Sequence, residues 1–276
     1  MNLLGGLCMV GLLIFLCNGC SEHRKADEMP EKRETPTSRL HEEMCCASTG
    51  VVKIVKLPGG EKLELVYCPP GEFYMGSPML EAGRGENESL HRVRVTKGFW
   101  IGKYEVTQAQ WRSVMKDNPS NFKGDSLPVE RVSWSACQDF LSKAGTGFRL
   151  PTESEWEYAC RAGSSGPYAG TGKIDEMGWC SEDSGSVTHC VGCKSANAWG
   201  IYDMHGNVWE WCQDCYEDCL GEEIIDRMGC STGDFRVFRG GGWSGNSFYS
   251  RSAARNRGLP NSSACDLGFR VAVSQE

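Results

Sequence analysis

The pattern of hydrophobic and polar positions divides the 276-residue chain into three parts. The first twenty residues are almost entirely apolar, and a stretch rich in Glu, Lys, Arg and Pro follows them. The apolar run is slightly short for a membrane span and is typical of a signal peptide, whereas the charged stretch cannot bury enough surface to fold by itself. We therefore predict a signal peptide over residues 1–20, a disordered tether over 21–49 and one domain over 50–276.

Short strands are predicted at the start of this domain. Residues 51–57 and 63–67 are rich in apolar side chains and flank Pro58-Gly59-Gly60, which indicates a hairpin. Residues 91–95 alternate between apolar and polar side chains, so they should form a strand with one face on the core.

Three helices are predicted over residues 107–115, 133–144 and 152–163. The first and third open with Thr followed three residues later by Gln or Glu, which is the pattern of a capping box, and the second opens with Ser. Beyond Gly163 the composition shifts to Gly, Ser, Asn, Trp and Cys. That shift predicts long ordered loops around short strands, with no further helix.

Composition narrows the class of protein. Charged residues make up 24% and hydrophobic residues 40% of the chain, which is ordinary for a soluble globular protein and excludes a multi-span membrane protein. The formal net charge of −7 gives no reason to expect nucleic-acid binding. The 16 cysteines are unusual, and they indicate an oxidising compartment or metal binding.

The end of the apolar run resembles the lipobox of bacterial lipoproteins, in which a small residue precedes a cysteine that is lipidated. Cys20 would be that residue and would anchor the chain to a membrane. Cys17 replaces the usual Leu of the box and no Lys or Arg precedes the run, so a plain cleaved signal and an uncleaved anchor stay open. All three alternatives place the domain outside the cytoplasm. Without Cys8, Cys17 and Cys20, 13 of the 16 cysteines remain, an odd number that leaves at least one thiol for a ligand or another chain.

Eight short motifs in a fixed order resemble the formylglycine-generating enzyme, or sulfatase-modifying factor, family. Among them are Gly206-Asn207-Val208-Trp209-Glu210 and Arg239-Gly240-Gly241-Gly242-Trp243. The complete set covers residues 57–60, 69–77, 104–107, 128–134, 149–159, 200–211, 239–243 and 268–271. The resemblance implies an α+β fold, the formylglycine-generating-enzyme variant of the C-type lectin fold, which is loop-rich with short strands and about three helices.

The resemblance also implies an activity that this sequence does not support. The enzymes of the family oxidise a sulfatase cysteine to formylglycine with O2 and Cu(I) held by two cysteines, and soft thiolates are what Cu(I) requires. Gly245 and Ser250 occupy the positions of those two thiols, and no cysteine lies between Cys230 and Cys265. Copper is therefore not expected. An iron-dependent branch uses histidines of a helical domain that is absent here, and the histidines of this domain, including His205, are expected to be surface or loop residues.

Four residues match a structural calcium site of the family. The resemblance implies carboxylate ligands from Asp203 and Glu210 and backbone carbonyl ligands from Gly206 and Val208. Hard oxygen donors on a loop bent by Gly suit Ca²⁺, although a cap or salt bridge would explain the same spacing.

Two C-x2-C pairs separated by 18 residues leave two interpretations open. Cys190, Cys193, Cys212 and Cys215 have the spacing of a four-thiolate zinc site. An exported location and three further cysteines nearby favour disulfides instead, whose connectivity the sequence does not determine.

The segment after the last glycine-rich motif is predicted to bind a ligand. Trp209, Trp211, Trp243 and Phe269 are most simply core aromatics, whereas the resemblance places the segment after Trp243 on the ligand-facing surface of lectin-fold relatives. Small polar groups mixed with aromatic and Arg side chains suit adaptable recognition. The candidate residues are Trp243, Asn246, Ser247, Phe248, Tyr249, Arg255, Asn256, Arg257 and Asn261.

These observations favour an exported, lipid-anchored module that binds an unknown protein or small molecule and has no cysteine-oxidase activity. The alternative hypothesis is an enzyme, either an atypical formylglycine-generating oxidase or another redox enzyme that uses the cysteine-rich region. A solvated loop without a ligand is the simplest alternative for the C-terminal segment.

Overall fold

The three predicted helices begin at the residues whose side chains cap them. The computed structural model describes residues 49–217, 223–226 and 233–275. Helix α2 (Gln108–Met115) and helix α4 (Glu153–Arg161) open with complete capping boxes, and α3 (Trp134–Ala144) opens at Ser133, whose side chain accepts from a backbone N–H. The prediction that no helix follows was wrong, because a single turn, α5 (Ile174–Met177), lies in the loop-rich half.

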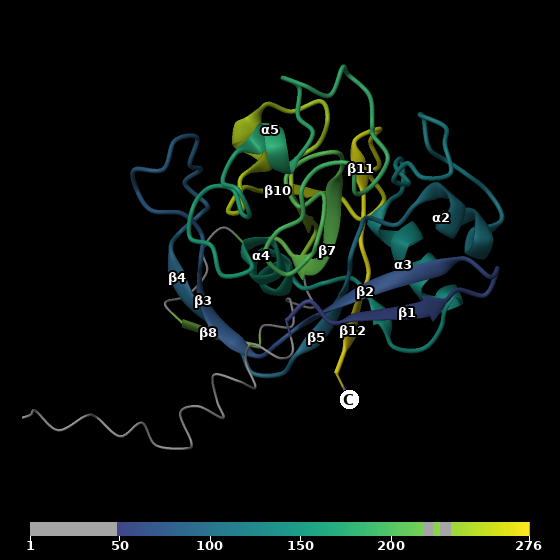
Figure 1. Cartoon of the computed structure of the whole chain (residues 1–276), viewed down its shortest axis with the longest axis horizontal. Coiled ribbons are helices and arrows are strands. Elements are labelled where there is room, and N and C mark those ends of the chain that lie inside the picture. Colours follow the sequence, from purple (N-terminus) through teal and green to yellow (C-terminus); the bar gives the residue numbers. More distant parts are fainter. Residues whose placement is uncertain (1–48, 218–222, 227–232, 276) are drawn as a thin grey trace, which may run out of the picture.

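The predicted hairpin forms one side of a five-stranded sheet. Its strands, in spatial order, are β1 (Val52–Lys56), β2 (Lys62–Cys68), β5 (Phe99–Gly102), β12 (Ala272–Ser274) and β6 (Phe148–Arg149). All neighbouring strands in this sheet are antiparallel. The last strand of the domain, β12, pairs with β5 on one side and β6 on the other, both from the first half of the domain. Figure 1 shows the C-terminal strand crossing the molecule toward this sheet.

Two smaller sheets complete the mixed architecture. One has the order β10 (Arg255–Gly258), β9 (Arg236–Arg239), β7 (Trp209–Cys215) and β11 (Leu267–Gly268). The polar C-terminal segment, residues 240–266, runs along the chain from the end of β9 to the start of β11 and includes β10. Both of its ends are therefore fixed by this sheet. In the other sheet β4 (His91–Val95), whose burial alternates as predicted, lies between two outer strands.

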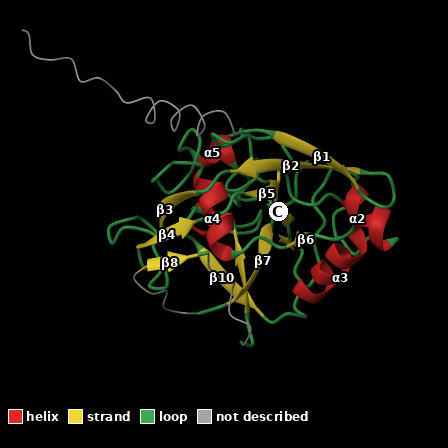
Figure 2. Ribbon diagram, turned by 90° about the horizontal axis from the view of Figure 1, so that it is seen from below, coloured by secondary structure: helices red, strands yellow, loops and turns green. Residues whose placement is uncertain are grey.

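The outer strands of that third sheet are β3 (Gly71–Met75) and β8 (Glu223–Ile225). Figure 2 shows α2 and α3 together on one side of the molecule and α4 among the sheets. Among the described residues, no helix is long and apolar enough to cross a membrane.

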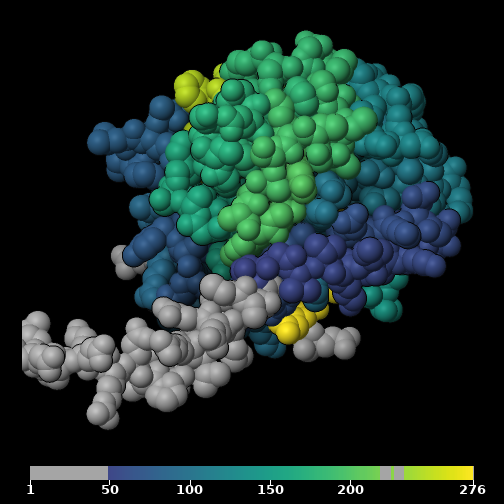
Figure 3. Space-filling model, in the orientation of Figure 1, coloured from purple at the N-terminus to yellow at the C-terminus, as the bar shows by residue number. Residues whose placement is uncertain are grey.

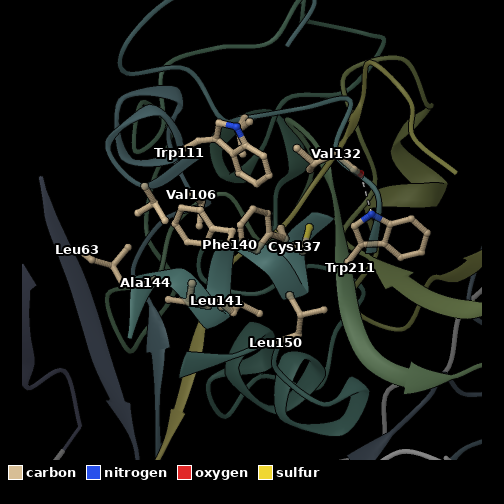
Figure 4. Close-up of a cluster of buried hydrophobic side chains, with 14 of the residues drawn as sticks. Leu63, Val106, Trp111, Val132, Cys137, Phe140, Leu141, Ala144, Leu150 and Trp211 are labelled. Carbon is tan, nitrogen blue, oxygen red and sulfur yellow. Dashed lines mark hydrogen bonds between the residues drawn. The ribbon is translucent and has the colours of Figure 1, made fainter. Parts of the chain in front are cut away.

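The main core packs helices α2 and α3 against the sheets (Figure 4). Trp111 and Phe140 stack with ring centroids 5.4 Å apart, and Phe269 meets both rings edge-on. Trp211 is fully buried, and its indole N–H donates to the Val132 carbonyl over 3.0 Å. Trp209 is also buried in this core, so the core prediction is confirmed for Trp209, Trp211 and Phe269, whereas Trp243 is only partly buried.

Candidate functional site

A half-open cavity of about 390 Å³ separates the loop of residues 83–88 from the C-terminal segment. The N-terminal half of that segment forms a 3-10 turn, Ser247–Ser250, which the Asn246 side chain caps by accepting from the Phe248 N–H. The turn leaves Phe248 and Tyr249 about half exposed, at 49% and 51%. Five predicted ligand-binding residues line the cavity: Asn246, Phe248, Tyr249, Arg255 and Asn256.

The other wall of the cavity was not predicted from the sequence. Gly83, Gly85, Asn87 and Glu88 line it from the loop between β3 and β4. Figure 3 shows this loop as blue atoms that project from the body of the molecule beside yellow atoms of the C-terminal half. The run of small and polar residues between these two strands could have indicated this wall, because binding residues often lie on such loops.

A buried arginine joins the two walls. Both Arg251 guanidinium ends reach Glu88, with N–O distances of 2.8 and 2.7 Å, and they also reach the Glu81 carboxylate and the Gly83 carbonyl at 2.6 Å each. Gly83 has φ of +76°, and a Cβ there would lie 2.4 Å from the ring of Phe248. Only glycine permits this conformation and this approach, so the loop is fixed against the aromatic side chain.

The charged groups at the cavity are already paired, so it offers a ligand mostly uncharged chemistry. Arg255 makes two hydrogen bonds of 2.7 Å to the Glu153 carboxylate at the start of α4. Burial alone would raise the pKa of Glu88, but hydrogen bonds from Arg251 and Ser77 and the charge of Arg251 outweigh it and lower that pKa. The other groups at the wall are the side-chain amides of three asparagines and the rings of Phe248 and Tyr249.

The other four predicted ligand-binding residues lie outside this cavity. Trp243 packs edge-on against Phe122, and the N–H and hydroxyl of Ser247 donate to Glu182. Arg257 lies over the rings of Tyr216 and Phe235. Asn261 accepts a hydrogen bond of 2.8 Å from the hydroxyl of Ser135 on α3.

The two residues expected at the positions of the family's copper-binding thiols, Gly245 and Ser250, belong to the same segment. Ser250 is fully buried, its hydroxyl has no hydrogen-bond partner among the described residues, and its carbonyl contacts His205 Nδ1 at 2.8 Å. The Gly245 carbonyl accepts from the Ser181 N–H over 2.8 Å. No cysteine is among the residues that line the cavity.

A thiol and an imidazole meet in the core behind this segment. Cys160 Sγ lies 3.7 Å from His205 Nε2, and both residues are fully buried. His205 lies in a loop, as one of the two predicted alternatives had it, but the surface alternative is wrong. Burial raises the pKa of the Cys160 thiol to about 12 and lowers the pKa of His205 to about 4. Both groups are therefore neutral near pH 7, unlike the thiolate and imidazolium of a reactive pair.

The predicted calcium ligands lie in a buried acidic cluster. Glu105, Asp203 and Glu210 surround a single cation, Arg270, which makes two hydrogen bonds of 2.6 Å to Glu210. Glu210 also accepts from the Trp156 indole N–H, so its carboxylate is already occupied. Asp203 Oδ1 is buried without a partner among the described residues, and burial raises the pKa of Asp203 to about 6. Burial and the charges of Asp203 and Glu210 raise the pKa of Glu105 well above its ordinary value, so a cation bound here would have to displace protons from the cluster.

The four cysteines with zinc spacing do not gather. Cys190 and Cys193 are exposed on a loop, whereas Cys212 and Cys215 are buried on β7. Within the described parts of the chain, no three His, Cys, Asp or Glu side chains are grouped to hold a metal ion, and no disulfide joins two cysteines. Cys20 and Cys230 lie outside the described residues.

Sequence comparison decides the family. Residues 54–275 match the sulfatase-modifying factor enzyme 1-like domain. This chain belongs to that family. The formylglycine-generating-enzyme variant of the C-type lectin fold, predicted from eight motifs, is thereby confirmed, and it is a loop-rich α+β fold.

This sulfatase-modifying-factor-type protein has relatives with different functional names, one a chaperone protein and one an enzyme. It is 32% identical over 202 residues to the chaperone protein LppX of Paenibacillus barcinonensis, a match that covers 52% of this chain and 69% of the relative. It is 33% identical over 203 residues to the formylglycine-generating enzyme of Mus musculus, over 67% of this chain. The match spans 53% of the length of the mouse enzyme.

Two solved structures resemble the domain closely. The Treponema denticola variable protein 1 superimposes with a TM-score of 0.75 at 29% identity, covering 82% of this chain and 100% of that one. PvdO from Pseudomonas aeruginosa superimposes with a TM-score of 0.72 at 29% identity, covering 82% and 99%.

Proposed function

We propose that this protein is an exported, lipid-anchored binding or accessory module that has no cysteine-oxidase activity. The observation that carries the proposal is the pairing of two features in one segment. The resemblance to the family implies that Gly245 and Ser250 stand at the thiol positions, and the same segment forms one wall of a cavity lined by aromatic rings and amides. Such walls suit recognition by shape and hydrogen bonds.

The comparisons support an accessory role without naming a ligand. One relative is named a chaperone protein, and another is named for formylglycine generation. A scaffold that occurs under both names is compatible with binding that has been separated from oxidation. An exported domain held at a membrane by Cys20 would meet its partner outside the cytoplasm. Labelling with a fatty-acid analogue, in the wild type and in Cys20→Ala, tests the anchor.

An oxidase assay separates the proposal from its enzymatic alternative. The full-length chain, loaded with copper, is incubated with O2 and a peptide that contains Cys-x-Pro-x-Arg, beside an active formylglycine-generating enzyme. We expect no aldehyde in the peptide, because hydroxyl and hydrogen side chains do not hold Cu(I) as thiolates do. Turnover above the copper-only blank, with one copper bound per chain, would refute the module hypothesis.

Site-specific crosslinking tests binding at the cavity directly. A photoreactive phenylalanine replaces Phe248 at the cavity wall or Leu259, which is equally exposed, at 49% and 50% respectively. In the envelope of the source cells we expect an adduct of defined mass at position 248 and none at 259. Equal labelling at both positions, or none at either, would contradict a ligand at this cavity.

The exposed C-x2-C pair favours a redox role as the second candidate. Cys190 and Cys193 are exposed, whereas most other described thiols are buried. Thiol counting before and after reduction measures whether this pair cycles between dithiol and disulfide. Cycling coupled to turnover of a disulfide substrate would favour the enzyme over the module.

A further inference from the structure

Strand β1 forms one edge of the five-stranded sheet and pairs only with β2 among the described strands. The Tyr67 N–H donates to the Val51 carbonyl over 3.0 Å, and the Leu57 N–H donates to the Glu61 carbonyl over 2.8 Å. Hydrogen-bonded pairs alternate along an antiparallel ladder, so every second residue of β1 turns its backbone groups away from β2. The residues that face outward are Val52, Ile54 and Lys56. Their N–H and C=O groups have no partner among the residues that the structure describes.

The side chains at this edge are apolar and accessible. Val52 and Ile54 are 43% and 59% exposed, and they lie on the same face of β1 because side chains alternate along a strand. On the opposite face Val55 packs against the main core, and Lys53 Nζ lies 5.8 Å from the centroid of the Trp100 ring. Lysines protect many edge strands from pairing, but Lys53 lies on its own sheet instead. Figure 2 shows β1 on the outside of the molecule, where another strand could reach it.

The sequence of β1, Val-Lys-Ile-Val-Lys, is complementary to itself. Antiparallel pairing about a two-fold axis at Ile54 places this residue opposite Ile54 of a second copy. Val52 of each copy then lies opposite Lys56 of the other. Lys53 of each copy lies opposite Val55 of the other. No cation faces a cation in this register, and the two exposed isoleucine side chains bury each other.

Neighbouring registers fit less well. An axis at Lys53 would place two lysines directly opposite each other, which is destabilising. An axis at Val55 would place Val52 opposite Pro58, which has no N–H to donate. We propose that the chain forms a homodimer by antiparallel pairing of two β1 edges about Ile54. A contact between strands of 5 residues is small beside the interfaces of stable dimers, so the association is weak and depends on concentration.

Hydrogen exchange followed by NMR tests the pairing residue by residue, on the full-length chain in excess nonionic detergent. We expect the amides of Val52, Ile54 and Lys56 to become protected as the protein concentration rises. The amides of Lys53 and Val55, which face β2, should be protected throughout. Outward amides that exchange freely at concentrations where dimers form would place the dimer contact elsewhere and overturn the proposal. Protection at every dilution would assign this edge to another segment of the same chain, with the same consequence.

Analytical ultracentrifugation of variants measures the strength of the contact. Ile54→Lys should raise the dissociation constant of the dimer at least about tenfold, because it removes the apolar contact at the axis and places two cations opposite each other. Ile225→Lys is the matched control, since Ile225 is 55% exposed on the outer strand β8 of another sheet. It should leave dimerisation unchanged.

Two substitutions of one residue test the register. Val52→Glu should lower the dissociation constant about threefold and Val52→Lys should raise it about threefold, because this position faces Lys56 of the second copy. The same change in both variants, or a wild-type chain that stays monomeric at all concentrations, would overturn the proposal. Either result leaves the proposed function untouched, since β1 does not line the candidate site.

Discussion

At the scale of single residues, burial and neighbouring charges decide which side chains are reactive and which could bind a cation. The thiol of Cys160 and the imidazole of His205 touch, yet burial keeps both neutral, so proximity alone does not make a reactive pair. Asp203 is the opposite case, because its buried carboxylate has an oxygen without a partner beside two further carboxylates. The buried oxygen without a partner is the physical argument for a cation at Asp203.

We predict that calcium raises the melting temperature of the wild-type protein and has little effect on Asp203→Asn. The substitution removes one of three carboxylates grouped around Arg270, and with it the charge that a cation would neutralise. Thermal unfolding with calcium and with a chelator measures both effects. Glu182→Gln, an exposed carboxylate in another loop, is the control and should respond to calcium like the wild type.

At the scale of elements, Arg251 joins the loop of residues 83–88 to the C-terminal segment, beside a further hydrogen bond from Arg255 to the Asn87 carbonyl. Its guanidinium is buried between Glu81 and Glu88 and accounts for four hydrogen bonds to the loop region. A buried arginine paired in this way is costly to disrupt from one side only. The shape of the cavity should therefore depend on the charge of Glu88.

We predict that this clamp weakens in acid. The pKa of Glu88 in the folded protein is lowered from its ordinary value of 4.5, so the ionised carboxylate stabilises the fold above pH 4.5 and this stabilisation is lost as the pH falls through the lowered pKa. Glu88→Gln should be less stable than the wild type at neutral pH, and the difference should shrink below pH 4.5. Denaturant unfolding at several pH values measures it. Glu86→Gln, exposed in the same loop, should behave like the wild type throughout.

At the scale of the whole molecule, a buried ionic network joins parts of the chain that are distant in sequence. Glu157 on α4 pairs with Arg161 on the same helix and with Arg239 on β9, and all three side chains are at most 5% exposed. Arg239 also donates to the carbonyls of Ser252, Ala253 and Ala254, which hold the C-terminal segment. The sheets, α4 and the candidate site are thus parts of one cooperative unit.

We predict that Glu157→Gln destabilises the protein by about 3–5 kcal/mol, because it leaves a buried arginine without its counter-charge. Glu72 provides a matched control, since it also bridges two arginines, Arg92 and Arg94, but at the surface. Glu72→Gln should leave the free energy of unfolding nearly unchanged. Equal losses for the two variants, measured by denaturant titration, would show that burial is not the deciding factor.

The sequence by itself determined the local structure and the family. Capping residues such as Thr107 and Thr152, the Pro58-Gly59-Gly60 turn and the alternation of residues 91–95 act over a few residues, so their signals could be read directly. The resemblance to the family further predicts that Gly245 and Ser250 replace its copper-binding thiols.

Only the tertiary structure decided which distant groups meet. It brought the loop of residues 83–88 to Phe248, paired Glu210 with Arg270, buried His205, and placed Cys190 and Cys193 on the surface while Cys212 entered the core. These outcomes depend on long-range packing and on the cost of burying charge. No pattern of neighbouring residues encodes either quantity.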